Sequence, residues 1–309
     1  MTRLLTRSDL GDLLEPSACL AALRDGFRAV GAEAAIPGQR VRTDLPFPGT
    51  ATALIPGLLP GIEAYTVKVN AKFPGARPAL RGVICLYSGV DGELLALLDS
   101  ATVTAWRTGL AAALGTHALA GPAEGAVVGV IGSGAQAELM VRGLGVLRPY
   151  GQLLVHDTDF ERAADFAVRH GGRVLGSATE IASDADIVLL ATWSRTPLLS
   201  LADTRAGQHF TSLGADEPGK RELAADLLDA ALVVVDDRQL VASVGALAPD
   251  DIDTTLGDVL RGDHPGRTDA TARSVYAPVG LPWQDLALAW LAYRRAEQDG
   301  VGRRVNLLG

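Results

Sequence analysis

The sequence is poor in cysteine and in long apolar runs, and each scarcity excludes a class of protein. Of its 309 residues, two are cysteine, which leaves no disulfide framework and no cysteine-based metal site. No stretch reaches the ~18–20 apolar residues of a membrane helix, and the charge-broken start, MTRLLTRSDLGDLLEP, lacks the apolar core of a signal peptide. We therefore expect a cytoplasmic protein without a membrane partner.

Basic residues are also scarce. Lysine and arginine number 28 against 36 aspartates and glutamates, for a formal net charge of −8 and a pI near 5.2, so a nucleic-acid partner is not expected. Five histidines at no ligand spacing predict no metal site. The chain has three lysines, Lys68, Lys72 and Lys220. Each either has a specific role or is present by chance in a chain whose basic residues are mostly arginine.

The first third of the chain predicts a helix followed by an antiparallel sheet. Apolar residues at helical spacing predict a helix over 9–31, with Pro16 starting a second helix at its first turn. From residue 39 onward, short extended segments alternate with Gly/Pro turns, as in a meandering antiparallel sheet. Arg42, Lys68 and Arg81 lie in these segments, either on a solvent-exposed face or at a site.

The stretch from residue 100 to 120 predicts an alanine-rich helix that packs closely against a neighbour. Arg107 lies in its middle, in AWRTGLAAA. An arginine among alanines is costly to bury without an anion. The partner is either a structural carboxylate or an anionic ligand.

From residue 126 the pattern changes to alternating apolar strands and helices, which predicts a parallel sheet covered on both faces. The first of these strands, VVGVI, leads into a G-x-G-x-x-A turn that opens a helix. In such turns the first glycine permits the bend, the second lets a pyrophosphate approach, and the helix start binds the phosphate. The predicted cofactor contacts of this loop are Gly132, Ser133, Gly134, Ala135 and Gln136, with Ala137 allowing close packing.

Asp157 ends the next strand, in VHDTD, close to the ~20-residue spacing at which an acid accepts hydrogen bonds from the adenosine ribose. A carboxylate there repels a 2′-phosphate, and no arginine immediately follows it. We therefore expect NAD, with NADP less favoured. The alternative is that Asp157 only caps the following helix.

Two further strand ends carry polar residues. Thr192 is the last residue of DIVLLAT and Ser194 follows it, while Gly214, Asp216 and Lys220 follow HFTSL. Ligands of open α/β sheets lie outside these carboxyl ends. We expect Thr192, Ser194 and Gly214 to contact the cofactor and Asp216 to lie near the nicotinamide, the alternative being an exposed loop aspartate.

These residues resemble the ornithine cyclodeaminase/mu-crystallin family, which includes archaeal-type alanine dehydrogenases, cyclic ketimine reductases and opine-forming synthases. The matching stretches run from about residue 42 to the end: TVKVN, WRTGLAAA, VIGSGAQA, VHDTD, TWSRTP, LGADEPGKREL and VGLPWQDLALAWLAYRRA. The resemblance implies a Rossmann-type doubly wound NAD(P) domain, over 121–283. It also implies an α+β substrate-binding and dimerisation domain, over 1–120 plus about 284–309, with the substrate in the cleft between them.

The resemblance also implies the roles of individual residues. Arg42, Lys68 and Arg107 would surround the carboxylate of an amino- or imino-acid substrate, with Lys68 and Asp216 catalytic. In mu-crystallin the position of Asp216 is not acidic, so the aspartate here favours a working enzyme. A homodimer is expected.

Two departures bear on the substrate. Cyclodeaminases of the family carry a glutamate where this chain has Ala53, and a threonine where it has Ala79. The glutamate would hold the distal ammonium of a diamine. We therefore predict a ketimine reductase or amino-acid dehydrogenase that transfers hydride between the substrate α-carbon and C4 of the nicotinamide. The alternatives are a cyclodeaminase that recycles its NAD, and a non-catalytic nucleotide-binding protein.

Overall fold

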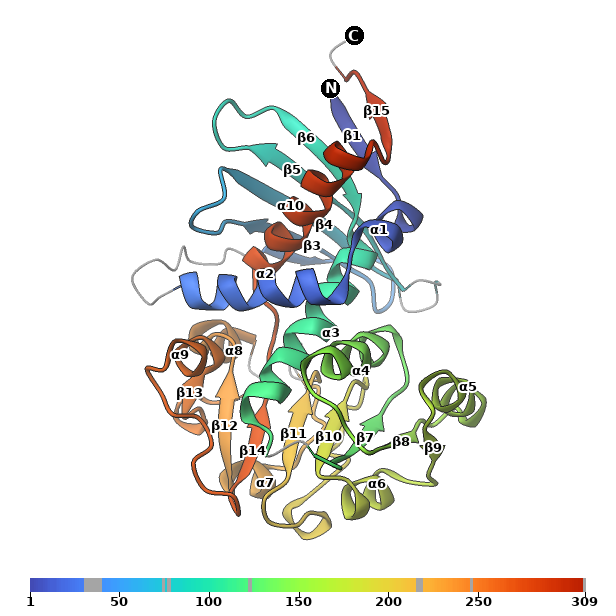
Figure 1. The fold of residues 1–309 in the computed structure, drawn as a ribbon, viewed down its shortest axis with the longest axis vertical. Coiled ribbons are helices and arrows are strands. Elements are labelled where there is room, and N and C mark those ends of the chain that lie inside the picture. Colours follow the sequence, from blue (N-terminus) through green and yellow to red (C-terminus); the bar gives the residue numbers. More distant parts are fainter. Residues whose placement is uncertain are drawn as a thin grey trace. The chain divides into compact units, whose positions relative to one another are not determined.

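The structure, a computed structural model, describes residues 1–30, 41–73, 76, 79–121, 124–214, 219–244 and 247–307. The chain divides into two compact units (Figure 1). The first unit comprises residues 1–107 and 281–309, and the second comprises residues 108–280. The boundary at Arg107 falls inside helix α3 (Ser100–Leu119), rather than at its end as the sequence suggested.

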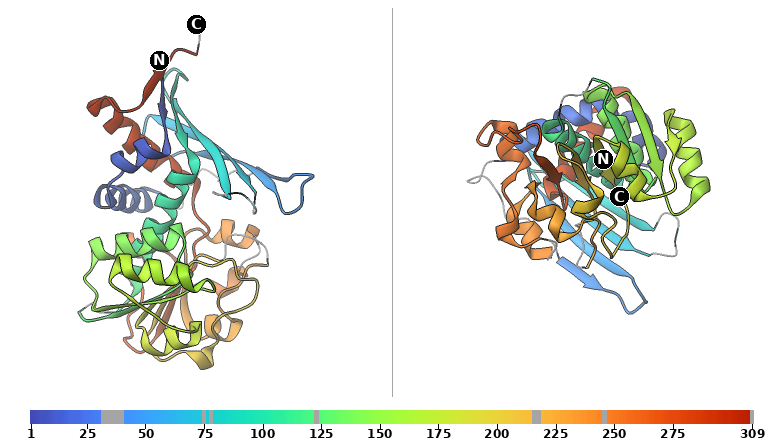
Figure 2. Two further views of the ribbon diagram at one scale, coloured as in Figure 1. Left: turned by 90° about the vertical axis from the view of Figure 1, so that its right-hand side faces the viewer. Right: turned by 90° about the horizontal axis from the view of Figure 1, so that it is seen from below.

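The first unit contains a seven-stranded sheet in the order β15-β1-β6-β5-β4-β3-β2. Its strands are β1 (Thr2–Leu5), β2 (Val41–Asp44), β3 (Ala51–Gly57), β4 (Ala64–Lys72), β5 (Leu80–Ser88), β6 (Leu94–Asp99) and β15 (Arg303–Val305). Strands β2 to β6 form the predicted antiparallel meander, and the β2–β3 hairpin extends from the sheet edge (Figure 2). The two terminal strands complete the opposite edge.

The helices of this unit are α1 (Arg7–Leu13), α2 (Pro16–Ala29) and α10 (Pro282–Asp299), together with the first two turns of α3. Pro16 is the first residue of α2, where its missing N–H costs no helical hydrogen bond. Helix α10 packs across β3, β4 and β5. The approach is close, since a Cβ built on Gly57 of β3 would lie 2.5 Å from the Pro282 carbonyl oxygen. One face of the sheet is therefore covered.

The second unit contains an eight-stranded parallel sheet in the order β13-β12-β14-β11-β10-β7-β8-β9. Its strands are β7 (Val127–Ile131), β8 (Gln152–His156), β9 (Arg173–Val174), β10 (Ile187–Leu190), β11 (His209–Ser212), β12 (Ala231–Val235), β13 (Thr254–Thr255) and β14 (Arg273–Tyr276). Its helices are α4 (Ala135–Leu147), α5 (Phe160–His170), α6 (Ala178–Asp184), α7 (Ala225–Asp229), α8 (Arg238–Val244) and α9 (Leu256–Arg261), with short 3₁₀ turns at Leu201–Asp203 and Pro249–Asp251.

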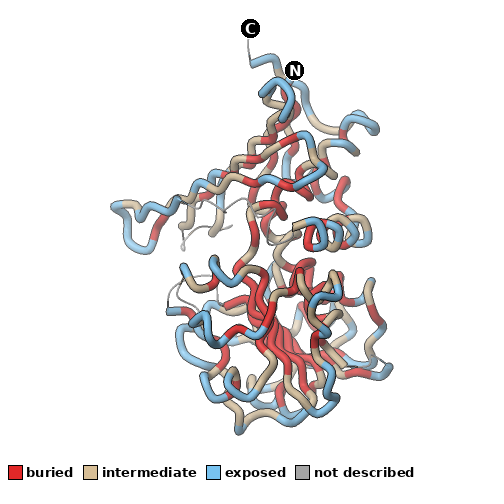
Figure 3. Tube along the Cα trace, turned by 90° about the vertical axis from the view of Figure 1, so that its left-hand side faces the viewer, coloured by how far each residue is buried: buried red, intermediate tan, exposed pale blue. Residues whose placement is uncertain are grey.

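Apolar clusters cover both faces of this sheet. One joins the strands to α3, α4 and α5, through Met140 and Phe166 among others. The other joins them to α6 and α7, through Ile181 and Leu227. Figure 3 shows the parallel strands as a continuous buried block. The predicted doubly wound fold is confirmed.

A buried hydroxyl–imidazole chain fastens the C-terminal half of α3 to this sheet. His209 lies between Ser274 and Thr211, each 2.9 Å from one ring nitrogen, and Thr211 contacts Thr116 of α3 at 2.7 Å. Thr116 donates to the Ala112 carbonyl. We assign the Nε2–H tautomer, because every hydroxyl then donates once along the chain. Burial lowers the pKa of His209 to about 3, aided by the positive charges of two nearby arginines.

A second buried group, Asp236, follows β12. Its carboxylate accepts hydrogen bonds from the backbone N–H groups of Val279 and Gly280, the last residues of the second unit. Burial raises the pKa of Asp236 to about 6, against the lowering effect of those hydrogen bonds. The segment that leads out of β14 is thereby fixed to the end of β12.

Candidate functional site

The glycine loop between β7 and α4 has the geometry of a phosphate-binding turn. Gly132 has φ +90°, and a Cβ there would lie 2.7 Å from the Ala191 carbonyl oxygen, so only glycine fits. Gly134 is the N-cap of α4, without a side-chain capping hydrogen bond, and a Cβ there would meet nothing within 4 Å. The first N–H groups of α4 and the open approach to Gly134 suit a dinucleotide pyrophosphate.

Asp157 is tied to this loop. Its Oδ2 accepts hydrogen bonds from the N–H and hydroxyl of Ser133, at 2.8 and 2.9 Å. Burial alone would raise the pKa of Asp157, but hydrogen bonds from Asp159 and Ser133 hold it below its usual value. Asp159, not Asp157, is the N-cap of α5, and Asp157 Oδ1 accepts a hydrogen bond from the Asp159 N–H.

Arg162, in the first turn of α5, lies 3.8 Å from Asp157 and 3.2 Å from Asp159. The sequence showed no arginine immediately after Asp157, but the helix brings this one back beside it. Its side chain is half exposed. A positive charge therefore lies next to the Asp157 carboxylate.

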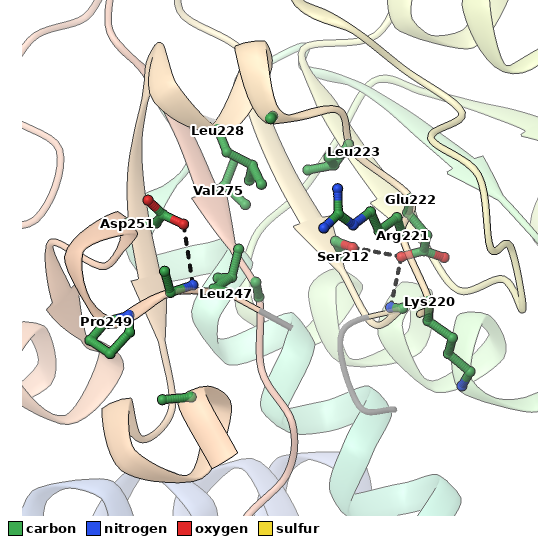
Figure 4. A pocket seen from close by; sticks show the side chains of 15 residues that line it. Ser212, Lys220, Arg221, Glu222, Leu223, Leu228, Leu247, Pro249, Asp251 and Val275 are labelled. Carbon is green, nitrogen blue, oxygen red and sulfur yellow. Dashed lines mark hydrogen bonds between the residues drawn. The ribbon is translucent and has the colours of Figure 1, made fainter. Parts of the chain in front are cut away.

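Glu222 joins the carboxyl ends of β10 and β11. Its Oε1 accepts hydrogen bonds from the N–H and hydroxyl of Thr192, at 2.6 and 2.7 Å. Its Oε2 accepts from the Ser212 hydroxyl and the Gly214 N–H, at 2.7 and 2.8 Å (Figure 4). Burial raises the pKa of Glu222, against the lowering effect of these four hydrogen bonds. A Cβ on Gly214 would lie 2.6 Å from the Glu222 side chain, which explains the glycine.

Glu222 also borders a cavity of about 450 Å³ within the second unit. The cavity lies along β11 and β14 and is lined largely by apolar side chains, including Leu223, Leu228 and Leu247 (Figure 4). Nearby, the Lys220 ammonium lies 4.2 Å above the ring of Trp193. Ser194 follows, donating its hydroxyl to the Thr196 carbonyl. Asp216, the expected catalytic acid, lies outside the described residues.

The first unit contains a buried charge cluster. The Lys68 ammonium lies 2.5 Å from Oδ2 of Asp285 at the start of α10, and both side chains are 2% exposed. The Nε of Arg107 lies 3.5 Å from Oδ1 of the same carboxylate, without hydrogen-bond geometry. Gln284 Oε1 accepts from the Leu281 N–H and lies 3.5 Å from Nη1 of Arg107. The structural carboxylate that the sequence left open for Arg107 is thus present.

Strand register places the other expected substrate residues. Lys68 pairs with Ile55, and Ala53, two residues before Ile55, pairs with both Arg42 and Asn70. Because paired and alternate residues share a face, Arg42 and Ala53 lie on the same face as Lys68. Arg42 is exposed and lies 3.4 Å from Asp44.

Arg81 pairs with Ala71, on the opposite and exposed face of the sheet. The interpretation of a solvent-exposed residue therefore holds for Arg81 but is wrong for Lys68.

Two acids that the sequence analysis left without a role are central to this geometry. Asp285 and Glu222 both lie within the matching stretches, but α10 was interpreted only as a packing helix. A signal existed for Asp285. A carboxylate in the buried first turn of a helix needs a cation, and Asp285 follows buried Trp283 and Gln284 and precedes buried Leu286. Among the described residues, no acid–histidine–cysteine cluster could hold a metal. Nor does any helix built from them have the length and apolarity to cross a membrane.

Comparison with known proteins places this geometry in context. The model of the ornithine cyclodeaminase/mu-crystallin family matches residues 2–300. The Thermococcus litoralis Delta(1)-pyrroline-2-carboxylate reductase, solved with NADH and L-proline, is 26% identical with a TM-score of 0.90, covering 98% of this chain and 100% of that one. An archaeal alanine dehydrogenase dimer with bound NAD is 26% identical, with a TM-score of 0.88 and 99% of each chain covered.

A third similar structure is named differently. The probable ornithine cyclodeaminase from Bordetella pertussis is 32% identical, with a TM-score of 0.88, covering 98% of this chain and 100% of that one. Similar structures thus include proteins named for a reduction, for a dehydrogenation and for a deamination.

Proposed function

Because the chain belongs to the ornithine cyclodeaminase/mu-crystallin family, we propose that it is an NAD(P)-dependent oxidoreductase acting at the α-carbon of an amino or imino acid. The bound nicotinamide would accept or supply the hydride. The similar reductase with NADH and L-proline and the similar dehydrogenase with NAD support this reaction class.

The observation that carries the proposal is the buried Lys68–Arg107 pair. Two cations meet at the Asp285 carboxylate on the covered side of a sheet, and such cations are suited to bind an anionic substrate group. A guanidinium suits a carboxylate because it donates in a planar, forked geometry. Arg42, on the same sheet face, is proposed as a further contact to the substrate.

Each residue of the proposed site has a chemical task. Arg107 would orient the substrate carboxylate, and Lys68 would donate a hydrogen bond to it and to the reacting nitrogen. Asp216 is proposed to take or return the proton at that nitrogen. In the second unit, the loop from Gly132 to Gln136 would hold the pyrophosphate, while Thr192, Ser194 and Gly214 would contact the nicotinamide half.

We propose NAD as the preferred cofactor. Asp157 is ionised, faces the glycine loop and would accept hydrogen bonds from the ribose hydroxyls. A 2′-phosphate would be repelled by it, although Arg162 reduces that repulsion.

The decisive test is a substrate screen with purified protein. NADH oxidation is followed with cyclic ketimines and with 2-oxo acids plus amines, and NAD reduction with the corresponding amino acids. Turnover that falls at least a hundredfold in Arg107→Ala supports the proposal. A wild-type protein that turns over no compound of these classes refutes it.

The second candidate is a cyclodeaminase, favoured by the 32% identity to the Bordetella protein. Ala53 argues against it, because no carboxylate is offered at that position of the Lys68 face. Release of ammonia from ornithine or lysine without net NADH change would establish the cyclodeaminase.

A homodimer through the open sheet face is also proposed. That face carries Leu54, 45% exposed, beside Val69, 36% exposed, and the stacked rings of Tyr65 and Tyr87. Apolar side chains on an exposed sheet face are typical of a protein interface. The dimer of the similar alanine dehydrogenase supports a second copy of this chain as the partner.

A further inference from the structure

The amino-terminal edge of the parallel sheet carries two arginines that have no part in the proposed function. Arg148 is the C-cap of α4, and Arg267 lies between α9 and β14. Because the strands are parallel, this edge lies opposite the carboxyl ends at which the glycine loop begins. We propose that Arg148 and Arg267 form a separate anion site that binds a phosphate group, either free inorganic phosphate or the phosphate of an organic monoester.

Gly121, just after α3, brings the two guanidinium groups together. Its carbonyl oxygen accepts a hydrogen bond from Nη2 of Arg148 at 2.5 Å. A Cβ built on the same residue would collide with Nη2 of Arg267, so a glycine is needed to leave space for the second guanidinium. Nη1 of Arg267 donates to the carbonyls of Gly207 and Ala272, which precede β11 and β14. These backbone contacts hold both side chains at the sheet edge.

Arg148 has buried donors without acceptors. The residue is 8% exposed, and its Nε and Nη1 are buried without a hydrogen-bond partner. Among the described residues of the second unit, no ion pair includes Arg148 or Arg267. Buried charges in proteins are normally paired, and unpartnered buried donors are rare. The guanidinium of Arg148 therefore calls for an anion that the described part of the chain does not supply.

The surrounding groups leave this positive charge uncompensated. Burial lowers the pKa of Arg148, and the charge of Arg267 lowers it further. The carboxylate of Asp269 acts on Arg267, but it is exposed and accepts the hydrogen bonds of Thr271 instead of forming an ion pair. His209 is neutral, and both arginines lower its pKa. The carbonyl groups at the ends of α3 and α4 carry partial charges, which offset only part of two full positive charges.

A phosphate group suits this arrangement better than a halide. Each guanidinium presents a planar fork of N–H donors, and a tetrahedral phosphate has enough oxygens to accept from two such forks at once. A phosphate monoester carries a charge of about −1.5 to −2 at pH 7, which matches two cations. Arg267 is partly exposed, so an anion would enter on its side. The unpartnered donors of Arg148 are covered, so binding requires a rotation of that side chain.

The test uses the full-length protein and ligand-induced thermal stabilisation, which needs neither turnover nor a cofactor. Inorganic phosphate and glycerol phosphate are each titrated against sodium chloride at equal ionic strength, which removes general screening. Both phosphates should stabilise the wild type more than chloride does. Arg148→Gln and Arg267→Gln should each weaken the apparent affinity at least tenfold, because each removes charged hydrogen bonds. Arg148→Lys keeps the charge and should weaken the affinity less than Arg148→Gln, which covers the case in which the neutral variant folds poorly.

The matched control is Arg205→Gln. Arg205 lies at the same edge, but it has its own acceptors, Asp186 at 2.7 Å and the Ala185 carbonyl at 2.9 Å. This variant removes the same charge and should keep the phosphate affinity of the wild type. Phosphates that stabilise the wild type no more than chloride does overturn the inference. So does an affinity that survives both Arg148→Gln and Arg267→Gln, because the anion then binds elsewhere, for example at the glycine loop. If the site is present, tighter binding of glycerol phosphate identifies an organic phosphate as the ligand, and tighter binding of inorganic phosphate identifies the free ion.

Discussion

The hydrogen bonds of Glu222 predict that replacing one of its carboxylate oxygens by an NH₂ group lowers both the stability of the protein and its affinity for the cofactor. In Glu222→Gln, one of the two oxygens becomes an NH₂ group. Each carboxylate oxygen now accepts from one backbone N–H and one hydroxyl. The hydroxyl can rotate to accept from the new amide, but the N–H cannot. Whichever way the amide is turned, the N–H of either Thr192 or Gly214 loses its acceptor.

The magnitude follows from those contacts. A buried backbone N–H without an acceptor costs ~1–3 kcal/mol, and the remaining bonds lose their charge assistance. Removing a buried negative charge offsets part of this loss, and we expect the free energy of unfolding to fall by about 2–3 kcal/mol. Because Thr192 and Gly214 are proposed cofactor contacts, about half of that loss should appear as a roughly tenfold higher Kd for NADH.

The assay compares Glu222→Gln with Ser212→Ala, which removes one hydroxyl donor and leaves both backbone N–H groups paired with the carboxylate. Ser212→Ala should cost only about 1 kcal/mol. Urea denaturation reports the stability, and NADH fluorescence reports the binding. If Glu222→Gln is no more damaging than Ser212→Ala in either measurement, Glu222 does not organise these strand ends as the geometry suggests.

Three further predictions concern the cofactor, the pH dependence and the oligomer. Asp157→Ser should raise the kcat/KM ratio of NADPH to NADH at least tenfold, because Arg162 would then face the 2′-phosphate unopposed; an unchanged ratio in steady-state kinetics contradicts this. His209 stays neutral in the folded state down to about pH 3, so its contribution to stability is lost as pH falls below 6.5, by up to about 5 kcal/mol. Asp236 has a raised pKa near 6 and acts in the opposite direction, adding up to about 3 kcal/mol as pH falls from 6 to 4. Urea titrations between pH 7 and 4 should therefore show a steeper loss of stability in Asp236→Asn than in the wild type, and equal slopes would refute the assignment. Val69→Asp places a charge on the open sheet face and should convert the proposed dimer to a monomer in light scattering, without loss of secondary structure.

The architecture of the second unit was predictable because local rules and global fold agree there. Its strands are continuous apolar runs, the pattern that a sheet buried on both faces requires. Gly132 has two reasons to be glycine, its positive φ and its contact with Ala191, and both follow from the turn. The terminal strands β1 and β15 were not predicted, because a three- or four-residue strand has too few positions to show a period.

The site was less predictable than the fold. Lys68, Arg107 and Asp157 carried a chemical signal of their own, as charged residues in apolar or strand-end positions. Asp285 gave a weaker signal, as a carboxylate in a helix with buried neighbours, but its partner Lys68 is 217 residues away. Glu222 gave none, because its partners lie on two different strand ends, 30, 10 and 8 residues before it, that only the folded chain brings together. The position of Arg162 beside Asp157 was not predicted either, because it depends on where the first turn of α5 places the arginine side chain.

Strand β4 explains why the usual rule of alternation misleads here. In AYTVKVNAK, Thr66, Lys68 and Asn70 share one face, while Tyr65, Val67 and Val69 share the other. The rule of apolar inside and polar outside would place the lysine in solvent. The structure shows the reverse, with the polar face under α10 and the apolar face open. A polar face can be covered only if its charges are paired, and Asp285 pairs with the charge of Lys68. The apolar face is uncovered within a single chain, and the second copy in the proposed dimer would cover it. Strand β4 therefore links the Lys68–Asp285 ion pair to the proposed interface. The ion pair accounts for the covered polar face, and the interface accounts for the open apolar face.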